Sequence, residues 1–234
     1  MSIYHLHIPR TSGVYIRNNV IPNLLANGIK HFASNRTFID TKEISDSKFV
    51  IGHFGRMPID QMKSPQVFTV LRDPVERFIS YFNYTTGQIR TKEEAEYKLS
   101  NWLWGQQSEI QSNMQSKFLT GSINIDKFNL NLTSQLHRVA HGWYIENYSL
   151  EFNDIKKSLE GINAYTIENL NKFKEDFSGA IKEEFGFNIF KNSDKANQSH
   201  KIKIEINEDQ IKRIKEMNLV DYEVYNYVKS IEKK

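Results

Sequence analysis

The stretch IYHLHIPRTSGVYIR, residues 3–17, contains a strand, a turn and the start of a helix in that order. The apolar run Ile3–Ile8 is typical of a buried strand, and it stops at Pro9. A short polar turn with Arg10 and Gly13 follows, and then the pattern becomes helical. In a parallel sheet such a turn lies at the carboxyl edge, where open α/β sheets bind ligands. The stretch therefore predicts a ligand-binding turn directly after the first strand.

Further β-rich runs predict the rest of a sheet. These runs are Phe49–Ile51, Val67–Leu71 and Ala164–Ile167. They alternate with helical patterns, and this alternation favours a parallel sheet flanked by helices. Residues 92–160 and the C-terminal part are mostly helical in pattern. We therefore expect an α/β fold with a largely helical middle and C-terminal region, in a single domain spanning residues 1–234.

Capping signals and apolar spacing predict particular helices. Helices are expected to begin after Asp73, Thr91 and Asn207, because each is followed by the proline or acidic residues of a helix start. The core positions expected in the helical middle are Trp102, Leu103, Phe118 and Leu119. A closing helical segment is predicted by the spacing of Ile211, Ile214, Leu219, Tyr222 and Tyr225. The last residues, 229–234, are expected to form a frayed tail.

Composition excludes several classes of protein. The 234 residues are 39% apolar and 25% charged, with 31 Lys and Arg against 28 Asp and Glu, a net charge of +3 that is too small to indicate a nucleic-acid binder. No apolar run is long enough to span a membrane, and no signal peptide is visible. The chain has no cysteine, so neither disulfides nor a thiolate nucleophile are available. We expect a cytoplasmic protein with no nucleic-acid or membrane partner.

The opening turn has the chemistry of an anion site. The first N–H groups of a helix have no internal partner, and the helix dipole favours negative charge there. Ser12 and Gly13 are small enough for an anion to approach, while Thr11 and Arg10 add donors. The alternative is a tight turn whose arginine is solvated. The P-loop pattern G-x-x-x-x-G-K-[ST] is absent, which disfavours an ordinary ATPase or GTPase.

A second strand running into a helix is found in VFTVLRDPVERFISY, residues 67–81. Arg72 ends the strand, and Ser80 lies about two turns into the helix. Together they could hold a second phosphate from two sides. In the alternative interpretation Arg72 is an ion-pair partner on the helix and Ser80 a small packing residue.

The two stretches together resemble the nucleotide-binding signatures of sulfotransferases that use PAPS, 3′-phosphoadenosine 5′-phosphosulfate. The most similar group contains the heparan sulfate 2-O- and 6-O-sulfotransferases and their bacterial and viral relatives. The second signature, R-D-P-x-x-R-x-x-S-x-Y, is matched at Arg72, Asp73, Pro74, Arg77, Ser80 and Tyr81. Weaker similarities follow at Gly52-His53-Phe54, at residues 113–121 and at residues 197–199. This resemblance implies a P-loop-NTPase-like fold.

The resemblance also implies roles for individual residues. Those that would bind the 5′-phosphosulfate of PAPS are Arg10, Thr11, Ser12, Gly13, Val14 and Tyr15. Arg72 and Ser80 would hold the 3′-phosphate, and Ser199 and Lys201 would close over the nucleotide. The product would be adenosine 3′,5′-bisphosphate (PAP), and no metal is expected. The acceptor would be a small molecule or saccharide with a free hydroxyl.

Two residues depart from the family pattern. Arg10 replaces a lysine, and Val14 replaces a threonine. Lysine can give a proton to the leaving phosphate oxygen, whereas arginine can stabilise that oxygen only by its charge. The departures keep open an alternative, a non-catalytic nucleotide-binding or adaptor protein that retains the fold.

Histidines supply the candidate base. His53 follows the Phe49–Ile51 run in the Gly-His segment, and a neutral imidazole can accept the proton of an acceptor hydroxyl. We expect His53 and Arg10 to be the catalytic residues; the alternative for His53 is a histidine bonded to the main chain at a strand end. His137 and His141 have metal-pair spacing, but neither a zincin glutamate nor a third ligand accompanies them.

Overall fold

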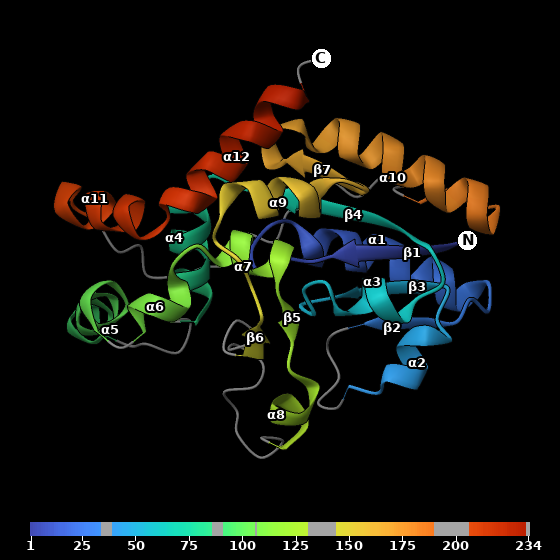
Figure 1. Cartoon of the computed structure of the whole chain (residues 1–234), viewed down its shortest axis with the longest axis horizontal. Coiled ribbons are helices and arrows are strands. Elements are labelled where there is room, and N and C mark those ends of the chain that lie inside the picture. The colour runs from blue at the N-terminus through green and yellow to red at the C-terminus, as the bar shows by residue number, and fades with distance from the viewer. Residues whose placement is uncertain (34–38, 86–90, 106, 131–143, 190–205, 233–234) are drawn as a thin grey trace.

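The structure is a computed structural model that describes residues 1–33, 39–85, 91–105, 107–130, 144–189 and 206–232. Its centre is a five-stranded sheet in the order β2-β3-β1-β4-β7 (Figure 1). The strands are β1 (Ser2–Leu6), β2 (His31–Ala33), β3 (Phe49–Gly52), β4 (Pro65–Leu71) and β7 (Ile162–Thr166). All neighbouring pairs are parallel. The predicted α/β fold with a parallel sheet flanked by helices is confirmed.

The sequence predicted four of these strands and missed others. Expected runs coincide with β1, β3, β4 and β7 to within a few residues. Strand β2 was not expected, nor was the small antiparallel pair of β5 (Ser122–Ile123) and β6 (Ile145–Glu146). Segments of two or three residues are too short to show the alternation that marks a strand.

Helices cover both faces of the sheet (Figure 1). On one face α1 (Gly13–Ala26) and α10 (Leu170–Phe185) share a buried cluster with alternate strand residues such as Ile3 and Phe68. The opposite face packs on α4 (Pro74–Thr85), α7 (Met114–Thr120), α9 (Phe152–Leu159) and α12 (Leu219–Ile231). The remaining helical segments are α2 (Thr41–Ser45), α3 (Met57–Gln61), α5 (Lys92–Trp104), α6 (Ser108–Gln111), α8 (Ile125–Leu130), η3 (Ile167–Asn169) and α11 (Glu208–Met217).

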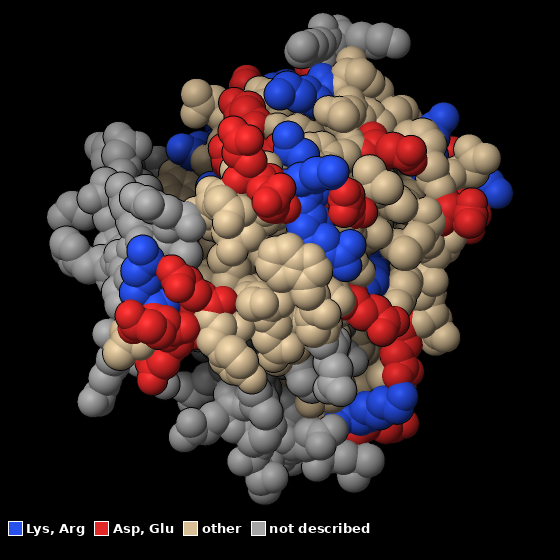
Figure 2. Space-filling model, turned by 90° about the vertical axis from the view of Figure 1, so that its left-hand side faces the viewer, with Lys and Arg blue, Asp and Glu red and all other residues tan. Residues whose placement is uncertain are grey.

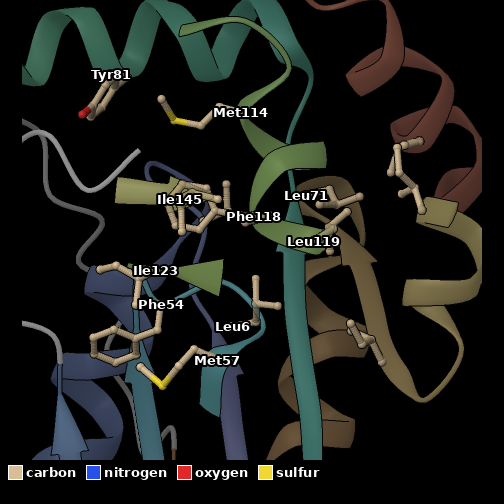
Figure 3. Close-up of a cluster of buried hydrophobic side chains, with 14 of the residues drawn as sticks. Leu6, Phe54, Met57, Leu71, Tyr81, Met114, Phe118, Leu119, Ile123 and Ile145 are labelled. Atoms are coloured by element: carbon tan, nitrogen blue, oxygen red, sulfur yellow. The ribbon is translucent and has the colours of Figure 1, made fainter. Parts of the chain in front are cut away.

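The larger of the two cores lies between the sheet and α7. Leu6 of β1 and Leu71 of β4 point from the sheet toward Phe118 and Leu119 of α7 (Figure 3). Successive strand residues face opposite sides of a sheet, which is why Tyr4 and Leu6 belong to this cluster and Ile3 belongs to the other. Both faces are therefore buried, as a parallel sheet requires.

The predicted helix caps are present. Asp73 accepts the N–H of Glu76 at the start of α4, Thr91 accepts that of Glu94 at the start of α5, and Asn207 forms a capping box with Gln210. The expected core residues of the helical middle are buried; these are Trp102, Leu103, Phe118 and Leu119.

The predicted closing helical segment is present as α11 and α12, which break at Asn218, with Leu219 62% exposed just after the break. One expectation for this region, the frayed tail, was wrong for residues 229–232. Helix α12 continues through Ile231, and the Glu232 carboxylate accepts hydrogen bonds from Thr166.

The strand order switches direction between β1 and β4. The connection after β1 leads through α1 to the β2 edge, whereas the connection after β4 leads toward the β7 edge. Ligands in open α/β sheets bind at such a point, outside the carboxyl ends of the strands where the topology switches direction. The turns that follow β1 and β4 therefore lie where a ligand is expected.

The surface carries both signs of charge. On the face shown in Figure 2, Lys and Arg side chains lie among Asp and Glu side chains. On this face, no large area carries charge of one sign alone. Among the described helices, none is both long enough and apolar enough to cross a membrane.

Candidate functional site

The turn after β1 has an unusual backbone. Arg10 and Ser12 both adopt left-handed conformations, with φ of 72° and 78°. This left-handed conformation is costly for residues other than glycine, and residues that adopt it cluster at functional sites. Turns of this kind aim successive N–H groups at one point and form anion-binding concavities. Ser12 is also the N-cap of α1, and its side chain does not cap the helix.

The two hydroxyls of the turn stabilise the turn itself. Thr11 is fully buried, and its Oγ1 donates to the Ile8 carbonyl at 2.8 Å. The Ser12 hydroxyl donates to the Thr11 carbonyl. The donors that remain for an anion are therefore the main-chain N–H groups at the start of α1 and the guanidinium of Arg10.

Gly13 allows the turn to pack on the first strand. A Cβ atom at this position would lie 1.9 Å from Nε2 of His7, an impossible contact. The His7 ring thus occupies the space that any other side chain at position 13 would need. This explains the glycine by packing, in addition to the close approach of a ligand.

The turn after β4 contains an ion pair. Nε of Arg72 lies 3.2 Å from a carboxylate oxygen of Glu76, one helical turn later. An ion pair between Arg72 and a residue of the helix was the alternative interpretation of Arg72 from the sequence. The Arg72 and Glu76 side chains are 26% and 60% exposed, and pairs so open to water contribute about 0–1 kcal/mol. A phosphate could therefore replace the Glu76 carboxylate at small cost.

The two turns meet through Arg10. Its Nε donates to Oγ of Ser80 at 3.0 Å, and its guanidinium lies 4.9 Å from the centre of the Tyr84 ring. Burial lowers the pKa of Arg10, the Tyr84 hydroxyl raises it, and the positive charge of Arg72 lowers it further. Arg10 contacts Ser80 and Arg72 pairs with Glu76, one helical turn apart on α4, so the two cations lie along the same side of that helix. Such an arrangement favours an anion between them.

Two other residues of the second stretch belong to the core instead. Arg77 is fully buried, and its terminal nitrogens contact Sδ of Met114 at 3.2 Å and the Gln111 carbonyl at 3.5 Å. The Tyr81 ring packs 5.5 Å from the Trp102 ring, and burial raises the pKa of its hydroxyl. These side chains hold α4 in place.

His53 lies beside the turn of residues 10–13. Its Nδ1 is 2.7 Å from the His7 carbonyl, and its ring centre is 4.2 Å from that of His7. A carbonyl can only accept, so Nδ1 carries the proton and Nε2 is the proton acceptor. Removal of the ring from water lowers the pKa of His53 to about 4; the bond to His7 raises this pKa, and the charge of Arg17 lowers it. The imidazole is therefore neutral at physiological pH.

Arg17 is a site residue that the sequence analysis missed. It follows Gly13 by four positions and so lies on the same face of α1. Helical side chains lean toward the N-terminus of their helix, so this position favours an Arg17 side chain directed toward Gly13. Its effect on the pKa of His53 agrees with this placement. The sequence feature that could have pointed to Arg17 is its i, i+4 spacing from Gly13.

Other predicted residues lie apart from this group. The Tyr15 ring contacts Nζ of Lys174 on α10 at 4.7 Å, and the Tyr15 N–H is bonded to the Ser12 carbonyl. The backbone of Val14 lies in the first turn of α1. The predictions for Ser199, Lys201, His137 and His141 fall outside the described residues. Within the described ranges, no group of three or more metal-ligating side chains is found.

Two hollows on the surface lie away from the turns. One of about 580 Å³ is lined by residues near the start of α2 and by residues 123–126. Another of about 380 Å³ lies between β4, β7 and α10. Neither is lined by Arg10, Arg72 or Ser80, so neither of these two hollows is the candidate site.

Comparison with known proteins gives the class. The model of the sulfotransferase family matches residues 31–228, which is most of the chain. The chain belongs to the sulfotransferase family, so it is a transferase of the kind that moves sulfuryl groups. The match does not single out the heparan sulfate group. A search of curated proteins found no match. The matched range includes Arg72, Ser80 and His53 but begins after the turn of residues 10–13.

Proposed function

We propose that this chain transfers the sulfuryl group of PAPS to a hydroxyl of a small-molecule or saccharide acceptor, as one domain of residues 1–234. The observation that carries the proposal is the contact between Arg10 and Ser80. It joins the turn after β1 to α4, the helix that follows β4, next to the point where the strand order switches direction and favours a ligand. The lack of cysteine is compatible with a cytoplasmic location, which we include in the proposal.

PAPS has an anion at each end, and two anion sites at neighbouring strands suit such a donor. In this proposal Arg10 and the main-chain N–H groups of the first turn bind the 5′-phosphosulfate. Arg72 and Ser80 bind the 3′-phosphate, with Arg72 exchanging its exposed pair with Glu76 for the phosphate. Ser199 and Lys201 remain the proposed residues that close over the nucleotide.

Transfer requires one bond to form as another breaks. The acceptor oxygen bonds to sulfur, and the bond from sulfur to the bridging phosphate oxygen breaks, which releases PAP. Nε2 of His53 takes the proton of the acceptor hydroxyl, for which the Nδ1 bond to His7 selects the correct tautomer. Arg10 keeps its proton and stabilises the charge on the leaving oxygen electrostatically.

Calorimetry with PAP tests the binding half of the proposal. Wild-type protein should bind PAP, and Arg72→Ala should weaken binding by about tenfold or more, because a hydrogen-bonded charge pair is lost. Lys215→Ala, which removes an equal charge from an exposed position on α11, should leave binding almost unchanged. Absence of PAP binding by the wild-type protein would refute the proposal.

Transfer itself separates the proposal from its alternative, a nucleotide-binding or adaptor protein without activity. Arg10 in place of lysine is the feature that favours the alternative. Labelled PAPS with a panel of hydroxyl acceptors should give a labelled product. A chain that binds PAP but labels no acceptor, saccharides included, would support the adaptor function.

A further inference from the structure

The side chain of Gln115, in α7, holds the main chain of Arg72 at two points. The Arg72 N–H donates to Oε1 of Gln115 at 2.9 Å, and Nε2 of Gln115 donates to the Arg72 carbonyl at 2.9 Å. Gln115 is fully buried. Arg72 is the first residue after β4, so one amide continues the hydrogen bonding of the strand by one residue.

Gln115 is itself fixed by a buried carboxylate from the C-terminal helix. Asp221 of α12 is fully buried and accepts the Gln115 N–H at 3.0 Å, as well as the Ser116 N–H and hydroxyl at 2.7 and 2.6 Å. Asn113 strengthens the same junction by accepting the N–H groups of Val220 and Asp221. A continuous set of bonds therefore runs from α12 through Gln115 to the tip of β4.

The position of the Arg72 side chain depends strongly on how firmly its main chain is held. The Arg72 guanidinium pairs with Glu76, one helical turn before Ser80, the residue that Arg10 contacts, so two cations lie along the same side of α4 before any anion binds. The two positive charges repel each other, while the Glu76 carboxylate attracts Arg72. A binding group misplaced by about 1 Å loses much of its effect, so a cation under these opposing forces gains most from a rigid starting point.

We infer that Gln115 is a positioning residue for the 3′-phosphate of the donor: by clamping the main chain of Arg72, it directs that guanidinium toward the point between β1 and β4 where the strand order switches direction. The inference rests on the proposed function, because it names the part of the donor that Gln115 serves. The inference predicts that loss of the Gln115 amide weakens binding of the 3′-phosphate only. If Gln115 merely stabilised the fold, its loss would weaken binding of nucleotides with and without a 3′-phosphate equally.

The test compares two nucleotides that differ only in the 3′-phosphate. Calorimetry gives the Kd of PAP and of adenosine 5′-phosphate for the wild-type protein and for Gln115→Met, which keeps the volume but has no amide. PAP binding should weaken by about tenfold, as expected when a charged hydrogen bond loses its geometry. The Kd of adenosine 5′-phosphate should change by less than about twofold, so the variant loses most of its preference for PAP.

A neighbouring variant provides the control. Ser116→Ala removes the hydroxyl bond to the same Asp221 carboxylate but leaves the amide on Arg72 intact. It should lower thermal stability while keeping the wild-type preference for PAP. If Gln115→Met does not fold, Gln115→Asn serves instead, because its shorter side chain cannot reach both groups of Arg72.

The outcomes distinguish this inference from the proposed function. Equal weakening of both nucleotides, or an unchanged preference for PAP, would overturn the role of Gln115 and leave the proposed function standing. If the wild-type protein binds neither nucleotide, or binds both equally, the proposed function fails, and the positioning role fails with it.

Discussion

Arg10 is the residue whose surroundings most limit the chemistry of this chain. Its Nε–H is donated to Ser80, and its plane lies over Tyr84, so the two terminal nitrogens are the ones able to reach a ligand. A guanidinium keeps its proton at any working pH. In the mechanism proposed above, Arg10 therefore acts by its charge and placement, and His53 takes the proton.

Side-chain directions explain what the sequence could and could not predict of the site. Charged and small residues after two strands predicted that Arg10, Arg72 and Ser80 would gather, since carboxyl ends of parallel strands share an edge. The bond from the Thr11 hydroxyl to Ile8 and the fit of Gly13 against the His7 ring depend on the packed turn. Those details follow from tertiary contacts, which cannot be predicted from a local sequence pattern.

His53 gives a prediction that separates binding from transfer. His53→Ala should keep the Kd of PAP within about twofold, because this ring is assigned to the acceptor proton. Transfer should fall by about 10²–10⁴-fold, the usual contribution of a general base. Steady-state rates beside calorimetry check both parts; turnover at the wild-type rate would exclude His53 as the base.

The pH dependence follows from the same ring. Because the pKa of His53 is lowered from 6.5 to about 4, its neutral form persists well below pH 6.5. The acid limb of kcat/KM should therefore fall near pH 4 in the wild-type protein. Arg17→Met removes a charge that lowers this pKa, so it should move the limb to higher pH. An acid limb that stays in place would contradict the placement of Arg17.

At the scale of elements, length decided which strands the sequence revealed. Strands β1, β4 and β7 have five residues or more and a visible apolar pattern, whereas β2 has three residues and β5 and β6 have two each. The short pair is held by neighbours instead: Gly55 bridges to Ser122, and Gly121 accepts the Arg56 N–H. Such pairing is a product of the fold rather than of propensity.

The end of α12 supports a prediction about stability. The Glu232 carboxylate accepts from the Thr166 N–H at 2.6 Å and from its hydroxyl at 2.8 Å, which attaches the last helix to the end of β7. Thr166 is 1% exposed, so Glu232→Ala would leave a buried N–H without its partner. The variant should lose about 1–3 kcal/mol in urea unfolding.

Glu223→Ala is the matched control, since it removes the same charge from an exposed position of the same helix. It should change stability by less than about 0.5 kcal/mol. Equal losses for the two variants would show that Glu232 does not anchor the helix.

At the scale of the whole molecule, the chain distributes one site over distant parts of the sequence. The turn after β1 supplies the first cation, the turn after β4 the second, and the C-terminal helix fixes the second through Gln115. The family match contains the latter two and not the first. Assignment of residues 10–13 to the same site therefore rests on the Arg10–Ser80 contact.

A crystal structure of the complex with PAP tests this account most directly. The account predicts the 3′-phosphate against the guanidinium of Arg72 and the hydroxyl of Ser80, and the 5′-phosphate on the N–H groups that begin α1, beside Arg10. PAP bound away from the turns that follow β1 and β4, or held by one turn while its other phosphate points into solvent, would contradict it.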